Sequence, residues 1–135
     1  MRQLFLLPVL WLFLAAGNAS DPPISDPSAA YCKLLGYKYE IRKDHKGDEH
    51  GVVVFPNGRE CDSWDFYRGI CGREFSYCAK KGCETTSVSE DQGAYKIVYC
   101  ACSCKDSLGR IQTIPLQKFM EQHGDTLIKP VPGRK

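Results

Sequence analysis

The sequence has no excess of charge of either sign and no concentrated basic segment. Eighteen basic and sixteen acidic residues give its 135 residues a formal net charge of +2. The basic residues are scattered, and the C-terminal Gly-Arg-Lys is typical of a solvated tail. Strong electrostatic binding of nucleic acid requires a clustered basic surface. We therefore expect no nucleic-acid partner.

The motifs of the common catalytic sites are also absent. The chain has no glycine-rich phosphate loop. It also has no serine in a nucleophile motif that is combined with histidine and aspartate in the order of a catalytic triad. It has no C-x-x-C pair, which disfavours a thioredoxin-like redox site. We therefore expect a protein that is not an enzyme and that requires no cofactor.

Only the N-terminus carries a long apolar run. Arg2 precedes an uncharged run at residues 4–16, and Gly17 and Ala19 occupy the −3 and −1 positions for cleavage after residue 19. The run is too short to span a bilayer comfortably, and the pattern is typical of a secretory signal peptide. The sequence predicts a signal peptide over residues 1–19 and a secreted or periplasmic mature protein without a membrane span.

Cysteine is the residue type that stands out. Small exported domains use disulfides to supplement a limited hydrophobic core. An even number of cysteines fits four bridges, but eight cysteines allow 105 connectivities, so the count alone gives no pairing. All eight follow the expected cleavage site: Cys32, Cys61, Cys71, Cys78, Cys83, Cys100, Cys102 and Cys104.

Two segments of the chain begin alike. Residues 31–36 read YCKLLG and residues 77–82 read YCAKKG, so that Tyr, Cys and Gly recur at an offset of 46 residues. Gly47 and Gly93 keep the same offset. We interpret the pattern as a degenerate tandem duplication. The alternative is a chance match between two short segments.

Each copy has the pattern of a helix, a β-hairpin, a turn and a second helix. In the first copy Asp26 and Gly36 favour the start and the end of a helix. Alternating and β-branched residues at 37–42 and 52–55 then predict two strands. Asp62 favours the start of the second helix.

The second copy repeats this order with a helix at residues 73–82, strands at 84–89 and 94–102, and a helix after Pro115. The sequence thus predicts an α+β protein of two helix–hairpin–helix units held by disulfides. The expected organisation is a signal peptide (1–19), a flexible leader (20–28), a first unit (29–72), a second unit (73–124) and a tail (125–135).

The first copy carries Tyr-Cys, Phe-Pro-Asn-Gly, Cys-Asp-Ser-Trp and Arg-Gly-Ile-Cys in that order. Over residues 26–71 this series resembles a small bacterial and archaeal domain of unknown function whose members are often labelled hemolysins. The resemblance implies a small, exported, cysteine-bridged domain and no defined activity. The matching positions are Pro27, Ala29, Tyr31, Cys32, Gly36, Gly51, Phe55, Pro56, Gly58, Cys61, Asp62, Trp64, Arg68, Gly69 and Cys71.

The chain departs from the family pattern at Val53, where the family has a cysteine. If Cys32 follows the family, its usual partner position therefore holds no sulfur. In the second copy Cys102 aligns best with that position, which predicts a bridge from Cys102 to Cys78. The second copy also lacks the tryptophan and the Arg-Gly-x-Cys ending.

The remaining cysteines lie on both sides of the second hairpin. Cys83 is expected to face the segment from Cys100 to Cys104, and the cysteine left over would bridge to Cys32 and tie the copies together. An alternative is that Cys100, Cys102 and Cys104, with Cys83, hold zinc or another soft metal. An oxidising compartment and the C-x-C-x-C spacing disfavour the metal site.

Cys61 and Cys71 are the pair that we favour most, because their bridge would close a short loop around a helix. That helix carries Trp64, Tyr67 and Arg68, of which Trp64 and Arg68 are four residues apart and share a face. The interpretation that we favour is structural, with Trp64 packed on Phe55 and Tyr31 and with Arg68 stacked on an aromatic ring or paired with Asp65. The alternative is that Trp64, Tyr67 and Arg68 form a binding site.

We expect a non-enzymatic interaction or cell-envelope protein that binds an unknown protein or envelope ligand. One alternative is a secreted peptidase inhibitor, in which the stiff loop Phe-Pro-Asn-Gly-Arg-Glu presents Arg59 to a protease. A second is the metal-binding protein, and a third is a membrane-active hemolysin. Neither the partner nor the oligomeric state follows from the sequence.

Overall fold

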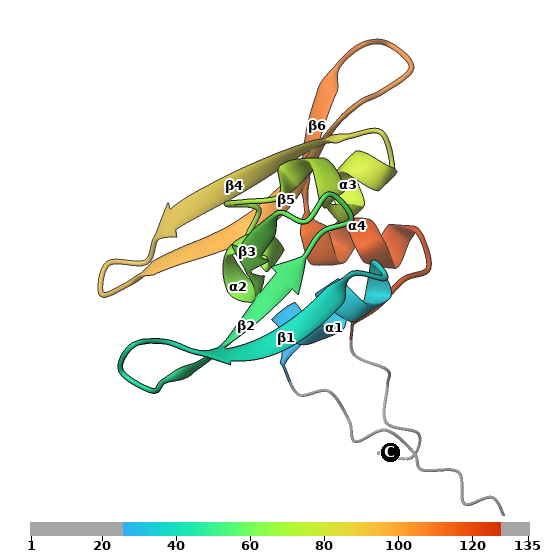
Figure 1. Ribbon diagram of the computed structural model, residues 1–135. Helices are drawn as coiled ribbons and strands as arrows, with labels where there is room; N and C mark the ends of the chain where they lie inside the picture. Colours follow the sequence, from blue (N-terminus) through green and yellow to red (C-terminus); the bar gives the residue numbers. More distant parts are fainter. Residues whose placement is uncertain (1–25, 128–135) are drawn as a thin grey trace, which may run out of the picture.

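The first half of the chain folds as a helix, three antiparallel strands and a short second helix (Figure 1). The computed structural model of the protein describes residues 26–127, so the expected signal peptide, most of the leader and the end of the tail lie outside the described residues. The elements of the first half are α1 (Pro27–Leu34), β1 (Lys38–Lys43), β2 (Glu49–Val54), β3 (Glu60–Asp62) and α2 (Ser63–Tyr67).

The second half follows the same order after one turn of 3-10 helix. Its sheet is larger, because β4 and β5 form a long hairpin that extends past the end of β6 (Figure 1). The elements are η1 (Arg73–Phe75), α3 (Tyr77–Lys80), β4 (Glu84–Asp91), β5 (Lys96–Lys105), β6 (Ile111–Pro115) and α4 (Leu116–Gln122).

The helix ends follow the expected capping residues. The side chain of Asp26 accepts a hydrogen bond from the backbone N–H of Ser28 at 2.9 Å, and Pro27 is the first residue of α1. Gly36 and Gly82, which follow α1 and α3, have φ angles of 77° and 76°. Glycine adopts this left-handed conformation without steric cost, so it ends both helices at the same offset of 46 residues.

Two features differ from the predicted helix–hairpin–helix units. Each sheet has a third strand, and the helix expected over residues 73–82 is divided into η1 and α3. The division occurs at Ser76, whose extended backbone and side-chain hydrogen bond to the N–H of Ala79 start a new helix. The α+β class and the antiparallel hairpins are as predicted.

One hydrophobic core serves both halves. The buried side chains include Tyr31, Val53 and Phe66 from the first half and Phe119 and Met120 from the second. Hydrogen bonds also join the halves. The backbone N–H of residue 77 donates to the Tyr31 hydroxyl at 2.9 Å, and the hydroxyl of residue 37 donates to the carbonyl of residue 75 at 2.9 Å. The two sheets are therefore packed around shared side chains.

Three disulfides join described cysteines: Cys61–Cys71, Cys78–Cys102 and Cys83–Cys104. The first two are the pairs that the sequence favoured. The Cys83–Cys104 bridge selects one of the two partners left open for Cys83.

The expected fourth bridge, from Cys32 to the second half, is wrong, because Cys32 and Cys100 are free and buried. The strand register gives the reason. Val53 pairs with Tyr39 in the first sheet as Cys102 pairs with Thr85 in the second. Cys32 thus has a valine in the place where Cys78 finds its partner sulfur.

Candidate binding site between the two halves

The short helix α2 is fixed at both ends. The carboxylate of Asp62 accepts hydrogen bonds from the backbone N–H groups of Trp64 at 2.9 Å and Asp65 at 3.1 Å, which satisfies the open end of the helix. The Cys61–Cys71 bridge joins the chain before α2 to the chain after it. The side chains on this helix are therefore held in place although it has only five residues.

The expectation that Trp64 packs on Phe55 and Tyr31 is wrong, because Phe66 fills that place in the core. The Phe66 ring lies 5.1 Å from that of Tyr31 and 5.0 Å from that of Phe55, measured between centroids, and its side chain is buried. Trp64 is 38% exposed. Two residues correspond to about 200° around a helix, so Phe66 and Trp64 face opposite sides of α2. Trp64 is thus a surface residue.

Arg68 stacks on Trp64. Its guanidinium carbon lies 5.2 Å from the centroid of the indole ring, and the Tyr67 ring meets the same indole edge-on at 5.9 Å. Stacking on an aromatic ring is one of the two arrangements considered for Arg68; the pairing with Asp65 does not form. Within residues 26–127 the Arg68 side chain has no hydrogen bond or ion pair, so its positive charge is not neutralised.

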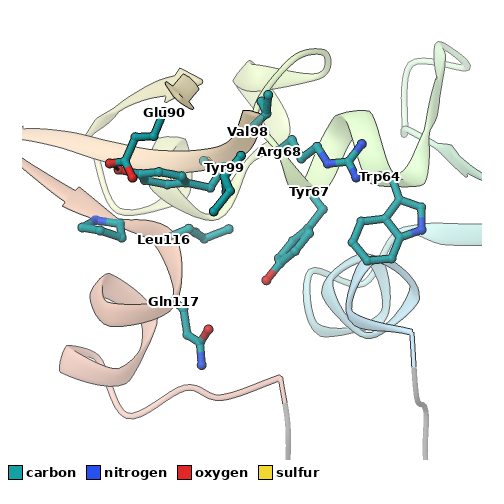
Figure 2. A pocket seen from close by; sticks show the side chains of 11 residues that line it. Trp64, Tyr67, Arg68, Glu90, Val98, Tyr99, Leu116 and Gln117 are labelled. Carbon is teal, nitrogen blue, oxygen red and sulfur yellow. Dashed lines mark hydrogen bonds between the residues drawn. The ribbon is translucent and has the colours of Figure 1, made fainter. Parts of the chain in front are cut away.

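These three residues form one wall of a pocket of about 480 Å³ (Figure 2). The opposite wall comes from the second half of the chain, from the end of β4, the first half of β5 and the junction of β6 with α4. The pocket therefore lies between the two halves. Its lining residues are Trp64, Tyr67, Arg68, Glu90, Ile97, Val98, Tyr99, Cys100, Pro115, Leu116 and Gln117.

Among the described residues that line this pocket, Glu90 is the acidic one, and it accepts a hydrogen bond from Tyr99. The hydroxyl of Tyr99 donates a hydrogen bond to Glu90 Oε1 at 2.6 Å, and this bond raises the pKa of Tyr99. Around these groups the lining is apolar, with Leu116 buried and Ile97 partly exposed. The pocket thus combines an apolar surface with the unpaired guanidinium of Arg68 on one wall and the hydrogen-bonded carboxylate of Glu90 on the other. The Arg68 side of the pocket suits a ligand that has an apolar part and an anionic group.

Cys100 lines the pocket as a free thiol. Burial raises its pKa to about 12, so the thiol stays protonated at neutral pH. Nucleophilic attack and metal binding both require the thiolate. Cys100 therefore contributes to this surface as a small apolar group.

The metal site considered for the Cys-Ala-Cys-Ser-Cys strand is wrong. Cys102 and Cys104 form disulfides with Cys78 and Cys83, so two of the three proposed ligands have no free sulfur. Among residues 26–127 no group of three histidine, cysteine or acidic side chains is placed to hold a metal ion.

Arg59 does not belong to the pocket. It follows the turn between β2 and β3 and forms an ion pair with Glu74, while its side chain remains 63% exposed.

A second cavity of about 480 Å³ lies beside α1 and β1, where Tyr37 and Tyr39 line it, but its cation Lys33 is already engaged. In the part of the chain that the structure describes, no helix is long and apolar enough to cross a membrane.

The half of the pocket contributed by the second sheet was not found from the sequence. Tyr99 and Leu116 carry no motif, and their position opposite Trp64 depends on how the two sheets pack. Pro115 is the one local signal, because proline ends a strand and permits the turn into α4. From the sequence, this proline predicts only the start of the following helix.

Residues 24–70 match the family model described as a domain of unknown function (DUF333). The chain is also similar to a protein of Archaeoglobus fulgidus described as uncharacterized, with 42% identity over 90 residues. The similarity covers 67% of this chain, and the chain spans 40% of the length of that relative. No solved structure matches the chain significantly. These findings support a small domain of unknown function, as the resemblance implied, and neither description refers to hemolysins.

Proposed function

We propose that the protein is an exported, disulfide-stabilised binding protein that holds its partner in the pocket between α2 and β5. The convergence of Trp64, Tyr67 and Arg68 with Tyr99 and Leu116 carries the proposal. Pockets of a few hundred Å³ with an apolar lining and few polar groups are typical ligand sites. Tryptophan, tyrosine and arginine are also the residues that contribute most to binding energy at interfaces.

Export and the absence of catalysis are part of the proposal. Export is supported by the apolar N-terminal segment and by three disulfides, which persist outside reducing compartments. A non-enzymatic role is supported by the Cys100 thiol, which burial keeps protonated and therefore unavailable as a nucleophile in the pocket.

We further propose that the two halves arose by duplication. The same backbone hydrogen bond follows α1 and α3, from the N–H of Tyr37 to the carbonyl of Cys32 at 3.1 Å and from the N–H of Cys83 to the carbonyl of Cys78 at 2.9 Å. Both partners of the bond keep the offset of 46 residues. The pocket is then a property of the pair, because each half supplies one wall.

A photo-crosslinking amino acid placed at Gln117 tests the binding function. Gln117 lines the pocket, whereas Leu108 is 74% exposed in the turn between β5 and β6 and serves as the matched control position. We expect a crosslinked partner from position 117 and none from position 108 in the exporting cell. The Trp64→Ala variant should lose that crosslink. Equal products from both positions, or a product that Trp64→Ala leaves unchanged, would contradict the proposal.

A further inference from the structure

The pocket lies along the edge of β5. Four consecutive residues of this strand, 97–100, line it. Successive side chains of a strand point to opposite faces of the sheet. A cavity that touches four of them in a row must therefore meet the strand from the side, where its backbone N–H and C=O groups are found.

The third strand of the sheet ends before it reaches this edge. β5 pairs with β4 over residues 96–103, but it pairs with β6 only over residues 101–105. β6 ends at Pro115, opposite Ala101, and the chain continues into α4 at Leu116. Within residues 26–127 no third strand pairs with residues 96–100 on this side, and the hairpin of β4 and β5 extends past β6 there (Figure 1).

The hydrogen-bond pattern shows which backbone groups face this place. The N–H of Gln92 donates to the carbonyl of Tyr95 at 2.9 Å at one end of β5. Hydrogen-bonded and non-hydrogen-bonded residue pairs alternate in an antiparallel ladder. The backbone N–H and C=O of Ile97 therefore point toward β4, and those of Val98 point away from it. The bond from the N–H of Asp106 to the carbonyl of residue 110 at 2.9 Å gives the same alternation from the other end.

We propose that the partner supplies an extended peptide segment that adds to the sheet as a strand beside residues 96–100. The proposal rests on the function proposed above and names the partner of that site. The N–H and C=O of Val98 would pair with the peptide backbone, as in other cases of strand addition to an open sheet edge. A small molecule with no peptide backbone would leave these two groups to water.

The side chains of the pocket define the sequence of the segment. The free guanidinium of Arg68 takes a carboxylate side chain of the peptide, since charge-assisted hydrogen bonds to arginine are strong. The Trp64 ring and Leu116 take an apolar side chain. Side chains on one face of a strand are two residues apart, so the motif is an acidic residue, any residue and an apolar residue.

Amide hydrogen exchange of Val98 in the full chain tests the proposal most sharply. The probe is the blocked peptide acetyl-Thr-Glu-Thr-Leu-Thr-amide, added to saturation. We expect the Val98 amide to exchange at least ~10-fold more slowly with peptide, because it acquires a backbone partner. The amide of Ile97, which already faces β4, is the internal control and should change little.

Two N-methylated peptides separate strand addition from simple side-chain binding. One is methylated at the Glu and Leu nitrogens and the other at the Thr nitrogens. A strand presents alternate N–H groups to its neighbour, so one peptide should bind at least ~10-fold more weakly and the other about as well as the parent. The parent should also bind ~10-fold better than its Lys-for-Glu analogue, and Arg68→Gln should remove that preference.

The outcomes distinguish the two proposals. One outcome is that the peptide shifts the Trp64 signals, but the Val98 amide exchanges as fast as without peptide and both methylated peptides bind as well as the parent peptide. Strand addition is then wrong, although the pocket still binds a ligand. If no peptide binds but position 117 crosslinks to a partner, the peptide class is wrong and the binding function stands. If neither is seen, both fall. Val98 protection without peptide, in a protein that sediments as a dimer, would assign the edge to a second copy and overturn the inference.

Discussion

Replacement of Val53 by cysteine should create a fourth disulfide, with Cys32. In the second half Cys78 on α3 is bonded to Cys102 on β5, with their Cα atoms 5.2 Å apart. In the first half Cys32 holds the position of Cys78, and Val53 holds that of Cys102 in the strand register. Both Cys32 and Val53 are fully buried in one core cluster, so a new thiol would face its partner without exposure to solvent.

The expected gain in stability follows from the size of the loop. The bridge would close a loop of about 21 residues, for which the chain-entropy model gives about 3 kcal/mol. The loss of the buried valine methyl groups costs about 1 kcal/mol. The net free energy of unfolding should therefore rise by about 2 kcal/mol, which corresponds to an increase in Tm of about 10 °C.

Intact mass and urea unfolding with and without reductant measure both effects. Val52→Cys is the matched control, because Val52 is buried on the adjacent position of β2 and faces the other side of the sheet. The mass of Val53→Cys should be about 2 Da below its reduced-pair value, while Val52→Cys keeps its thiol. The reasoning fails if Cys32 stays free in Val53→Cys, or if the bridge forms and lowers Tm.

Three further predictions concern the core. Gly72→Ala should destabilise the protein by roughly 2–4 kcal/mol in urea unfolding, because Gly72 has a φ of 64° and a Cβ there would overlap the ring of Phe55; a loss below 1 kcal/mol would contradict that packing. Burial raises the pKa of both Cys32 and Cys100 to about 12. Iodoacetamide at pH 8 should therefore label neither thiol in the native state, but two thiols per chain after unfolding without reductant. Rapid labelling of the native protein would refute this prediction. Burial also raises the pKa of Tyr31 in the folded state, so the contribution of Tyr31 to the unfolding free energy should be constant below about pH 10 and fall above it, in addition to the decrease that the two buried thiols cause from about pH 9. Tyr31→Phe should therefore reduce the decrease above pH 10, and an unchanged slope there would contradict the prediction.

The elements that have local signals could be predicted from the sequence. Asp26 and Asp62 cap helices as expected, and the pairing of Cys78 with Cys102 followed from the alignment of the two copies. The short β3 was missed because Glu60–Asp62 has only three residues and no alternation. β6 was missed because its polar residues and terminal proline resemble a loop. Both strands are fixed by the neighbouring strand more than by their own residues.

The candidate site was predicted only in part. Trp64, Tyr67 and Arg68 were selected as one group, and they lie together in the pocket. Trp64 was expected in the core, where the structure places Phe66 instead. A helix of five residues has too short a pattern to define its buried face, so the larger side chain was taken as the core residue. The opposite wall, with Tyr99 and Leu116, depends on contacts between residues distant in the chain.

The central claim is that the pocket between the two halves is a binding site. A fragment screen by NMR tests it without knowledge of the natural partner, with small compounds that carry one apolar ring and one carboxylate. We predict that these fragments shift the Trp64 indole and Leu116 methyl signals and that Arg68→Gln weakens their binding. Fragments that instead shift the Tyr39 signals of the second cavity, or that bind nowhere, would contradict it.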